Sequence, residues 1–251
     1  MRSLGFRQRA HNRYWWHRVP STDYVPMLYE FLDEDEWSLL QQWFDDTEQR
    51  YPSTGEAGVP ALSLLLGLIS GNGISRIVQL GHYVGYSTLM IGFMARHMNK
   101  RRMLYSVDID PAVSAYARGW VERAGLGAEV HLEIGDSADP DRPKQAAGYL
   151  GGAPQLIFID SSHQYAHTLR ELDLWFPALV AGGFLLMHDS SDFARGFDKA
   201  GGQGVKQALE EWIGANRVAA LNVNGFVGGG RPGDYPYLDG CGLTIIQKSP
   251  A

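Results

Sequence analysis

Residues 77–87 read IVQLGHYVGYS, a short apolar strand followed by a glycine-containing turn and the start of a helix. Gly81 and Gly85 allow the backbone to turn tightly and to approach a ligand, and the helix that begins near Ser87 presents free N–H groups to an anion. The G-x-x-x-G spacing differs from the G-x-G-x-x-G of dinucleotide enzymes and from the phosphate loop with its Gly-Lys-Ser/Thr. The motif therefore indicates either a ligand-binding loop or a purely structural turn.

Apolar runs alternate with helical patterns on both sides of this segment. Strands are predicted at 77–80, 104–107, 130–134, 156–159, 184–187, 218–223 and 243–247, and helices at 61–70, 87–98, 111–124, 168–180 and 205–215. This alternation predicts an α/β fold, a doubly wound Rossmann-like sheet of seven mostly parallel strands with helices on both faces. A loop without a helix joins the last two strands, so we expect the last strand to be antiparallel.

The N-terminal region has a different charge pattern. Five arginines and no acid precede Asp23, whereas residues 30–48 contain eight acids and no Lys or Arg. We expect residues 1–60 to form an arm and a helical cap, and residues 61–251 to form the main domain. The arm is expected to lie on its own acidic helix or on that of a second subunit, in a homodimer or higher homo-oligomer. Two separately solvated faces are the alternative.

Two helix starts can be predicted from capping residues. Trp37, Leu40 and Phe44 recur at helical spacing, so one face of the acidic helix is expected to be buried, with Asp33 as its N-cap. Asp110 stands directly before a proline, an arrangement typical of an N-cap followed by the first helical residue. Both acids are therefore assigned to helix ends rather than to a ligand.

The composition excludes several classes of protein. The chain of 251 residues has a net charge of −6 and a single cysteine, Cys241. A negative chain has no global reason to bind nucleic acid, whose phosphates attract clustered Lys and Arg. One cysteine cannot form an internal disulfide, and the longest apolar stretch, 62–69, is too short to span a bilayer. We expect a cytoplasmic protein with no nucleic-acid or membrane partner.

Acidic side chains follow the second and third predicted strands. Asp108 ends the second strand, where a carboxylate can accept hydrogen bonds from ribose hydroxyls. Asp136 and Ser137 follow the third strand, where Asp136 can accept a hydrogen bond from an adenine amino group or serve only as a turn residue. These two strand ends favour recognition of a nucleoside.

Two acids and two histidines follow the fourth and fifth predicted strands, namely Asp160, His163, His188 and Asp189. Because the carboxyl ends of parallel strands meet at one edge of a sheet, we expect these side chains to lie together. Such a group can bind a hard divalent cation, or it can pair a general base with the acid that orients it. A serine-based triad is disfavoured, since the chain has no G-x-S-x-G elbow.

Five stretches in this order resemble the class I S-adenosylmethionine-dependent methyltransferases, namely residues 77–87, Asp108, 135–137, 158–175 and 182–189. Within that class the chain is similar to the branch containing the macrocin-type sugar O-methyltransferases and the methyltransferase-like component of cephalosporin hydroxylase. The resemblance covers residues 60–190. It implies that the main domain binds S-adenosyl-L-methionine as its cofactor.

The resemblance also implies a role for each motif residue. Gly81, Tyr83, Gly85 and Ser87 would surround the methionine part of the cofactor, Asp108 its ribose, and Asp136 with Ser137 its adenine. Asp160, His188 and Asp189 occupy the positions of the metal ligands in Mg²⁺-dependent members, and His163 lies where a general base would stand. Two residues depart from the family pattern. Gln79 replaces an acid that contacts the cofactor's amino group, and His188 replaces a carboxylate or amide.

We expect an O-methyltransferase acting on a hydroxyl of a small molecule of the natural-product, sugar or phenolic type. His163, alone or with Asp160, would accept the proton, with Mg²⁺ or another divalent cation as an optional assistant. The acceptor pocket is expected from the arm, the helix at 61–70 and the loops 192–204 and 225–242. Two alternatives stay open, a NAD-dependent oxidoreductase and a non-methylating, cofactor-binding partner subunit of a hydroxylase-like system.

Overall fold

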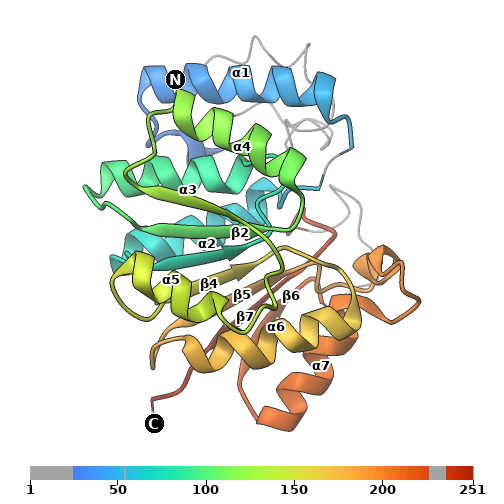
Figure 1. Ribbon diagram of the computed structural model, residues 1–251. Coiled ribbons are helices and arrows are strands. Elements are labelled where there is room, and N and C mark those ends of the chain that lie inside the picture. The colour runs from blue at the N-terminus through green and yellow to red at the C-terminus, as the bar shows by residue number, and fades with distance from the viewer. Residues whose placement is uncertain (1–24, 54, 226–235, 251) are drawn as a thin grey trace.

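The computed structural model describes residues 25–53, 55–225 and 236–250 and contains a seven-stranded sheet within them. The strands are β1 (Ile77–Leu80), β2 (Leu104–Asp108), β3 (Val130–Ile134), β4 (Leu156–Ile159), β5 (Phe184–His188), β6 (Ala220–Val223) and β7 (Leu243–Gln247). They are arranged in the order β3-β2-β1-β4-β5-β7-β6, and β7 runs antiparallel to both of its neighbours (Figure 1). The predicted fold class and the antiparallel last strand are confirmed.

Helices cover both faces of the sheet (Figure 1). One side carries α1 (Glu34–Arg50), α2 (Val59–Asn72), α3 (Tyr86–His97) and α4 (Pro111–Arg123), and the other carries α5 (Arg142–Leu150), α6 (Tyr165–Ala178) and α7 (Gly204–Asn216). Each side has its own cluster of buried apolar side chains. Short 3-10 helices lie at Met27–Tyr29 and Phe193–Phe197. The chain therefore folds as three layers with the sheet in the middle.

The predicted helices begin and end within three residues of the observed ones, but α5 is an additional element. Its nine residues include Pro143 and Gly148 and bury only three side chains, so the sequence has no extended apolar repeat there. The connection between β3 and β4 is thus a crossover that contains a helix rather than a loop alone.

The order of the strands decides where ligands can bind. β1 pairs with β2 on one side and with β4 on the other, both in parallel. The chain leaves β1 toward one edge of the sheet and returns through β4 toward the other, which makes the gap between these strands the switch point of the fold. The loops that begin at Gly81 and Asp160 lie on either side of this gap.

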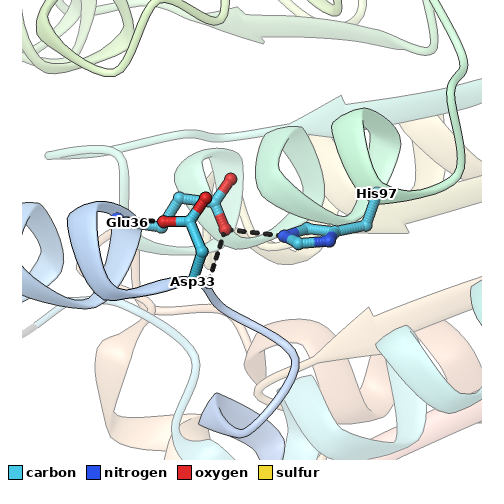
Figure 2. Close-up of side chains that lie close together, drawn as sticks. All are labelled: Asp33, Glu36 and His97. Carbon is cyan, nitrogen blue, oxygen red and sulfur yellow. Dashed lines mark hydrogen bonds and ion pairs between the residues drawn. The ribbon is translucent and has the colours of Figure 1, made fainter.

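A buried glutamate joins α1 to the end of α3 (Figure 2). Asp33 accepts a hydrogen bond from the Glu36 amide at 2.8 Å, and the Glu36 side chain accepts one from the Asp33 amide at 3.2 Å, which confirms the predicted N-cap. Glu36 also lies 3.2 Å from Arg96 Nη1 and 2.7 Å from His97 Nε2, in the last turn of α3. Cations near a helix C-terminus are favourable, so this contact stabilises both helices.

The N-terminal helices share a core with the sheet. The predicted apolar face of α1, formed by Trp37, Leu40 and Phe44, is buried in the same cluster as α2 and α3. The division of the chain at residue 60 stays a prediction, and the arm at 1–22 lies outside the described residues. In the part of the chain that is described, no helix combines the length and the apolar character needed to cross a membrane.

Candidate active site

The loop after β1 is shaped by close contact with the end of β4. Gly81 has a φ of 83°, and a Cβ atom there would lie 2.0 Å from the carbonyl oxygen of Asp160, so only glycine fits. Gly85, with a φ of 97°, precedes the first turn of α3. Asp108 at the end of β2 accepts hydrogen bonds from the amides of His82 at 3.0 Å and Tyr83 at 2.9 Å. The loop is therefore held from both neighbouring strands.

A buried polar network supports the loop from below. Gln79 is fully buried, donates to Ser87 Oγ at 2.7 Å and accepts from Thr88 Oγ1 at 2.9 Å. His82 is also buried, with Nδ1 3.1 Å from Ser106 Oγ and Nε2 2.9 Å from a second serine hydroxyl. Burial lowers the pKa of His82 to about 4, so its ring is neutral. The side chains of Gln79 and Ser87 thus hydrogen-bond to each other rather than facing a ligand.

Above this loop lies a cavity of about 710 Å³. Five of the residues expected to bind the cofactor line it, namely Gly81, Tyr83, Asp108, Asp136 and Ser137. Gln79, Gly85 and Ser87 lie behind its wall. Asp160 and His163 line the same cavity at its other end, so the loops of four different strands meet here. The site lies at the switch point of the sheet, as expected for a doubly wound fold.

The Asp136 side of the cavity is braced by two residues of α6. Asp136 Oδ1 lies 2.9 Å from His167 Nε2, and His167 Nδ1 lies 3.4 Å from Glu171 Oε2. Glu171 is fully buried and accepts hydrogen bonds from Ser137 Oγ at 2.5 Å and from Ser161 Oγ at 2.7 Å. The hydrogen bond from His167 lowers the pKa of Asp136, which therefore stays ionised. His167 and Glu171 were not predicted, although their i, i+4 spacing places them on one face of a helix.

The two acids and two histidines predicted at the ends of β4 and β5 do lie together. His163 Nε2 is 3.0 Å from Asp189 Oδ2, and His188 Nδ1 is 3.3 Å from Asp160 Oδ1 and 3.5 Å from Asp189 Oδ2. A third carboxylate, Asp239, lies 2.8 Å from His188 Nε2 and was not predicted. The antiparallel register brings Asp239 there by pairing the start of β7 with the end of β5, and the sequence alone carries no signal for that register.

Neighbouring charges control ionisation in this cluster. Burial alone would lower the pKa of His188, but the carboxylates of Asp189, Asp239 and Asp160 outweigh it and raise that pKa well above its ordinary value. Burial would likewise lower the pKa of His163, yet the Asp189 carboxylate raises it. Burial raises the pKa of Asp160. Perturbed ionisation of several groups in one cavity is typical of a functional site.

A second cavity of about 470 Å³ adjoins the first. The two share the lining residues Gly55, His163, Phe197 and Lys199, and the second alone contains His188, Asp189 and Phe193. His163 therefore stands at the junction of the two cavities. Part of the loop predicted to shape the acceptor pocket, 192–204, lines the second cavity, whereas residues 226–235 lie outside the described part of the chain.

Comparisons with known proteins identify the family. Residues 78–190 match the family model described as a methyltransferase domain. The catechol O-methyltransferase of Niastella koreensis is 33% identical over 175 residues, which cover 65% of this chain and 73% of that protein. The chain belongs to the S-adenosylmethionine-dependent O-methyltransferases. This result favours the methyltransferase interpretation over the NAD-dependent oxidoreductase.

Solved structures of other O-methyltransferases share the fold of this methyltransferase. The enzyme from Bacillus cereus, in complex with SAH, has a TM-score of 0.60 at 20% identity and covers 86% of this chain and 92% of that one. The enzyme from Streptomyces achromogenes involved in tomaymycin synthesis, in complex with SAM, has a TM-score of 0.60 at 18% identity and covers 87% and 91%. At these identities the likeness concerns the fold alone.

Proposed function

We propose that this methyltransferase methylates a hydroxyl of a small catechol-type or other phenolic compound, with a divalent cation bound beside the acceptor. The observation that carries the proposal is the position of His163 at the junction of the two cavities, 3.0 Å from Asp189. The catechol O-methyltransferase relative supports a phenolic acceptor. The aromatic rings of Phe193 and Phe197 in the second cavity are suited to packing against such a ring.

In this proposal the cofactor occupies the cavity of about 710 Å³. Gly81 and Tyr83 would contact its methionine part, Asp108 its ribose hydroxyls, and Asp136 with Ser137 its adenine. S-adenosylmethionine supplies the methyl group on a sulfonium sulfur and leaves as S-adenosylhomocysteine. Gln79 stands where the family pattern has an acid, and its side chain hydrogen-bonds to Ser87 and Thr88. The difference from the family therefore alters the support of the cavity rather than its lining.

The residues of the cluster fit a divalent cation. Asp160 Oδ1 and His188 Nδ1 are buried 3.3 Å apart and, within the described residues, form no hydrogen bond. These two atoms pair through charge when His188 is protonated, and a cation held by Asp160, His188 and Asp189 would take the place of that proton. Such an ion would lower the pKa of a nearby acceptor hydroxyl and orient it.

His163 acts as the general base in this proposal. Its side chain is 34% exposed and faces both cavities, so it can reach a hydroxyl in the second cavity. As the methyl group passes from the sulfonium sulfur to the acceptor oxygen, the hydroxyl proton would pass to His163 Nδ1, because Nε2 already faces the Asp189 carboxylate. Asp189 stabilises the resulting imidazolium, while the cavity walls keep donor and acceptor in line.

The test is turnover with catechol, measured as release of S-adenosylhomocysteine in the presence of Mg²⁺ or Mn²⁺. We expect His163→Gln to lower kcat by about 10²–10⁴-fold with an unchanged Kd for S-adenosylmethionine, since it removes only the base. His131→Gln, at an ion pair on β3 far from the cavities, is the matched control and should keep its activity. Undiminished turnover by His163→Gln would refute the base, and no methylation of any phenol would refute the acceptor class.

A further inference from the structure

Asp239 fixes the orientation of the His188 ring. Its Oδ2 accepts a hydrogen bond from His188 Nε2 at 2.8 Å, and both side chains are nearly inaccessible, at 1% and 5% exposure. The other oxygen, Oδ1, accepts a hydrogen bond from the amide of Cys241 at 3.0 Å, so the carboxylate is itself held in place. Because a carboxylate only accepts, Nε2 donates this hydrogen bond, which leaves Nδ1 as the ring atom that can hold either a proton or a metal ion.

The second ring nitrogen of His188, Nδ1, faces two carboxylate oxygens. His188 Nδ1 lies 3.3 Å from Asp160 Oδ1 and 3.5 Å from Asp189 Oδ2. Among the described residues neither Nδ1 nor Asp160 Oδ1 forms a hydrogen bond, although both are buried. In the metal-free protein a proton on Nδ1 pairs with these oxygens, and a metal ion bound between them would take the place of that proton. Histidines that bind metal ions through one ring nitrogen commonly donate the other N–H to a carboxylate, as His188 does to Asp239.

Within the described residues two groups of potential metal ligands lie close together, namely Asp160, His163 and Asp189 at this site and Asp33, Glu36 and His97 between α1 and α3. The second group differs from the first. Asp33, Glu36 and His97 lie close enough to share an ion, yet Glu36 already accepts hydrogen bonds from the Asp33 amide and His97 (Figure 2). Glu36 also accepts one from Arg96. The carboxylate oxygens of Glu36 are therefore used by the contacts between α1 and α3, and this group of residues needs no ion. It therefore carries no site and provides a control.

A nitrogen donor changes which ions the site can hold. Mg²⁺ takes oxygen ligands and keeps several waters, whereas imidazole suits first-row transition ions such as Mn²⁺, Fe²⁺, Co²⁺ and Zn²⁺. We propose that His188 Nδ1, with Asp160 and Asp189, binds a first-row transition-metal ion in preference to Mg²⁺, and that Asp239 positions the imidazole for it. The inference rests on the proposed function, because it names the class of ion at the same site.

The test measures binding rather than turnover. The full-length protein is freed of metal with a chelator and titrated with Co²⁺, Zn²⁺ or Mg²⁺ by calorimetry, and the visible absorption of bound Co²⁺ is recorded. We expect Co²⁺ to bind at least about tenfold more tightly than Mg²⁺, with d–d bands that shift in His188→Asp because an oxygen replaces the nitrogen. His188→Asp should also narrow the difference between Co²⁺ and Mg²⁺.

Two further variants separate ligand orientation from general damage. Asp239→Asn should weaken Co²⁺ binding by about 10–100-fold, the usual effect of losing an outer carboxylate, while His97→Gln at the satisfied cluster should leave it unchanged. If a variant fails to fold, the d–d bands of Co²⁺ in the unaltered protein still test whether a nitrogen atom is among the ligands.

Three results would overturn the inference. These are equal affinity for Mg²⁺ and Co²⁺, identical Co²⁺ bands in the unaltered protein and in His188→Asp, or no cation binding at all, in which case a protonated His188 supplies the positive charge. Failure of the proposed function is distinguishable. Methylation of catechol with Mg²⁺ bound as tightly as Co²⁺ refutes only the ion preference, whereas tight Co²⁺ binding without methylation of any phenol refutes only the acceptor class.

Discussion

The buried ring of His82 should make the stability of the protein depend on pH. It is 2% exposed, lies between two serine hydroxyls beneath the loop after β1, and has a pKa lowered from 6.5 to about 4 by burial. The unfolded chain therefore binds more protons than the folded one between these two values. Lowering the pH from 7 favours the unfolded chain, and the loss stops below about pH 4.

The magnitude follows from the two pKa values. Each pKa unit corresponds to about 1.4 kcal/mol, so the contribution of His82 to the free energy of unfolding falls by about 3 kcal/mol between pH 7 and pH 4. About 2 kcal/mol of this loss should occur by pH 5. That is a large share of the stability of an ordinary domain, so the effect is measurable by denaturant titration.

His82→Asn isolates this contribution. The variant loses a fixed amount of stability at every pH through its altered hydrogen bonds, but its amide does not titrate. Urea unfolding followed by tryptophan fluorescence at pH 7, 6 and 5 gives both free energies, and the advantage of the unaltered protein should shrink by about 2 kcal/mol over this range. Parallel curves for the two proteins would show that His82 does not titrate with a depressed pKa, and would refute the reasoning.

Three further perturbations have defined outcomes. Gly81→Ala should abolish binding of S-adenosylmethionine in calorimetry because its Cβ would collide with the Asp160 carbonyl oxygen after β4. Gly119→Ala, in open space on α4, should instead raise stability by about 0.5–1 kcal/mol. Glu36→Gln should cost about 1–3 kcal/mol in denaturant titration and speed amide exchange in α1, and unchanged exchange would argue against the joint with α3. His167→Asn should weaken cofactor binding by about tenfold and leave the KM for catechol unaltered, since it releases Asp136, and a change confined to the KM would contradict this role.

Much of the fold could be predicted from local patterns. The runs at β1, β4 and β5 lie at the predicted positions and are buried apart from the half-buried Phe184, because parallel strands covered on both faces are mostly apolar. Gln79 in β1 is a buried polar exception. The helix-free connection after β6 predicted an antiparallel β7. By contrast, α5 has only nine residues, contains proline and glycine, and buries Arg142, Ala146 and Leu150, so its helical period includes a single large apolar side chain and is too weak to detect.

Site residues could be predicted from the sequence only where the order of the strands fixes their positions. Asp160 and Asp189 end neighbouring parallel strands, so their proximity followed from the strand assignment. Asp239 depends on the register of an antiparallel pair that places residue 243 opposite residue 188, and register cannot be obtained from a single sequence. The inward hydrogen bonding of Gln79 depends on which neighbours face it, and those neighbours come from β2 and α3.

The position of Asp239 has a consequence for folding. It lies 51 residues after His188 in the chain, and it reaches the ring only when β7 has inserted between β5 and β6. Contacts that close long loops form late, so the strands β1 to β5 can assemble before the ring of His188 is oriented. Uptake of Co²⁺ during refolding should therefore lag behind the recovery of helix signal and report the moment at which the last strand docks.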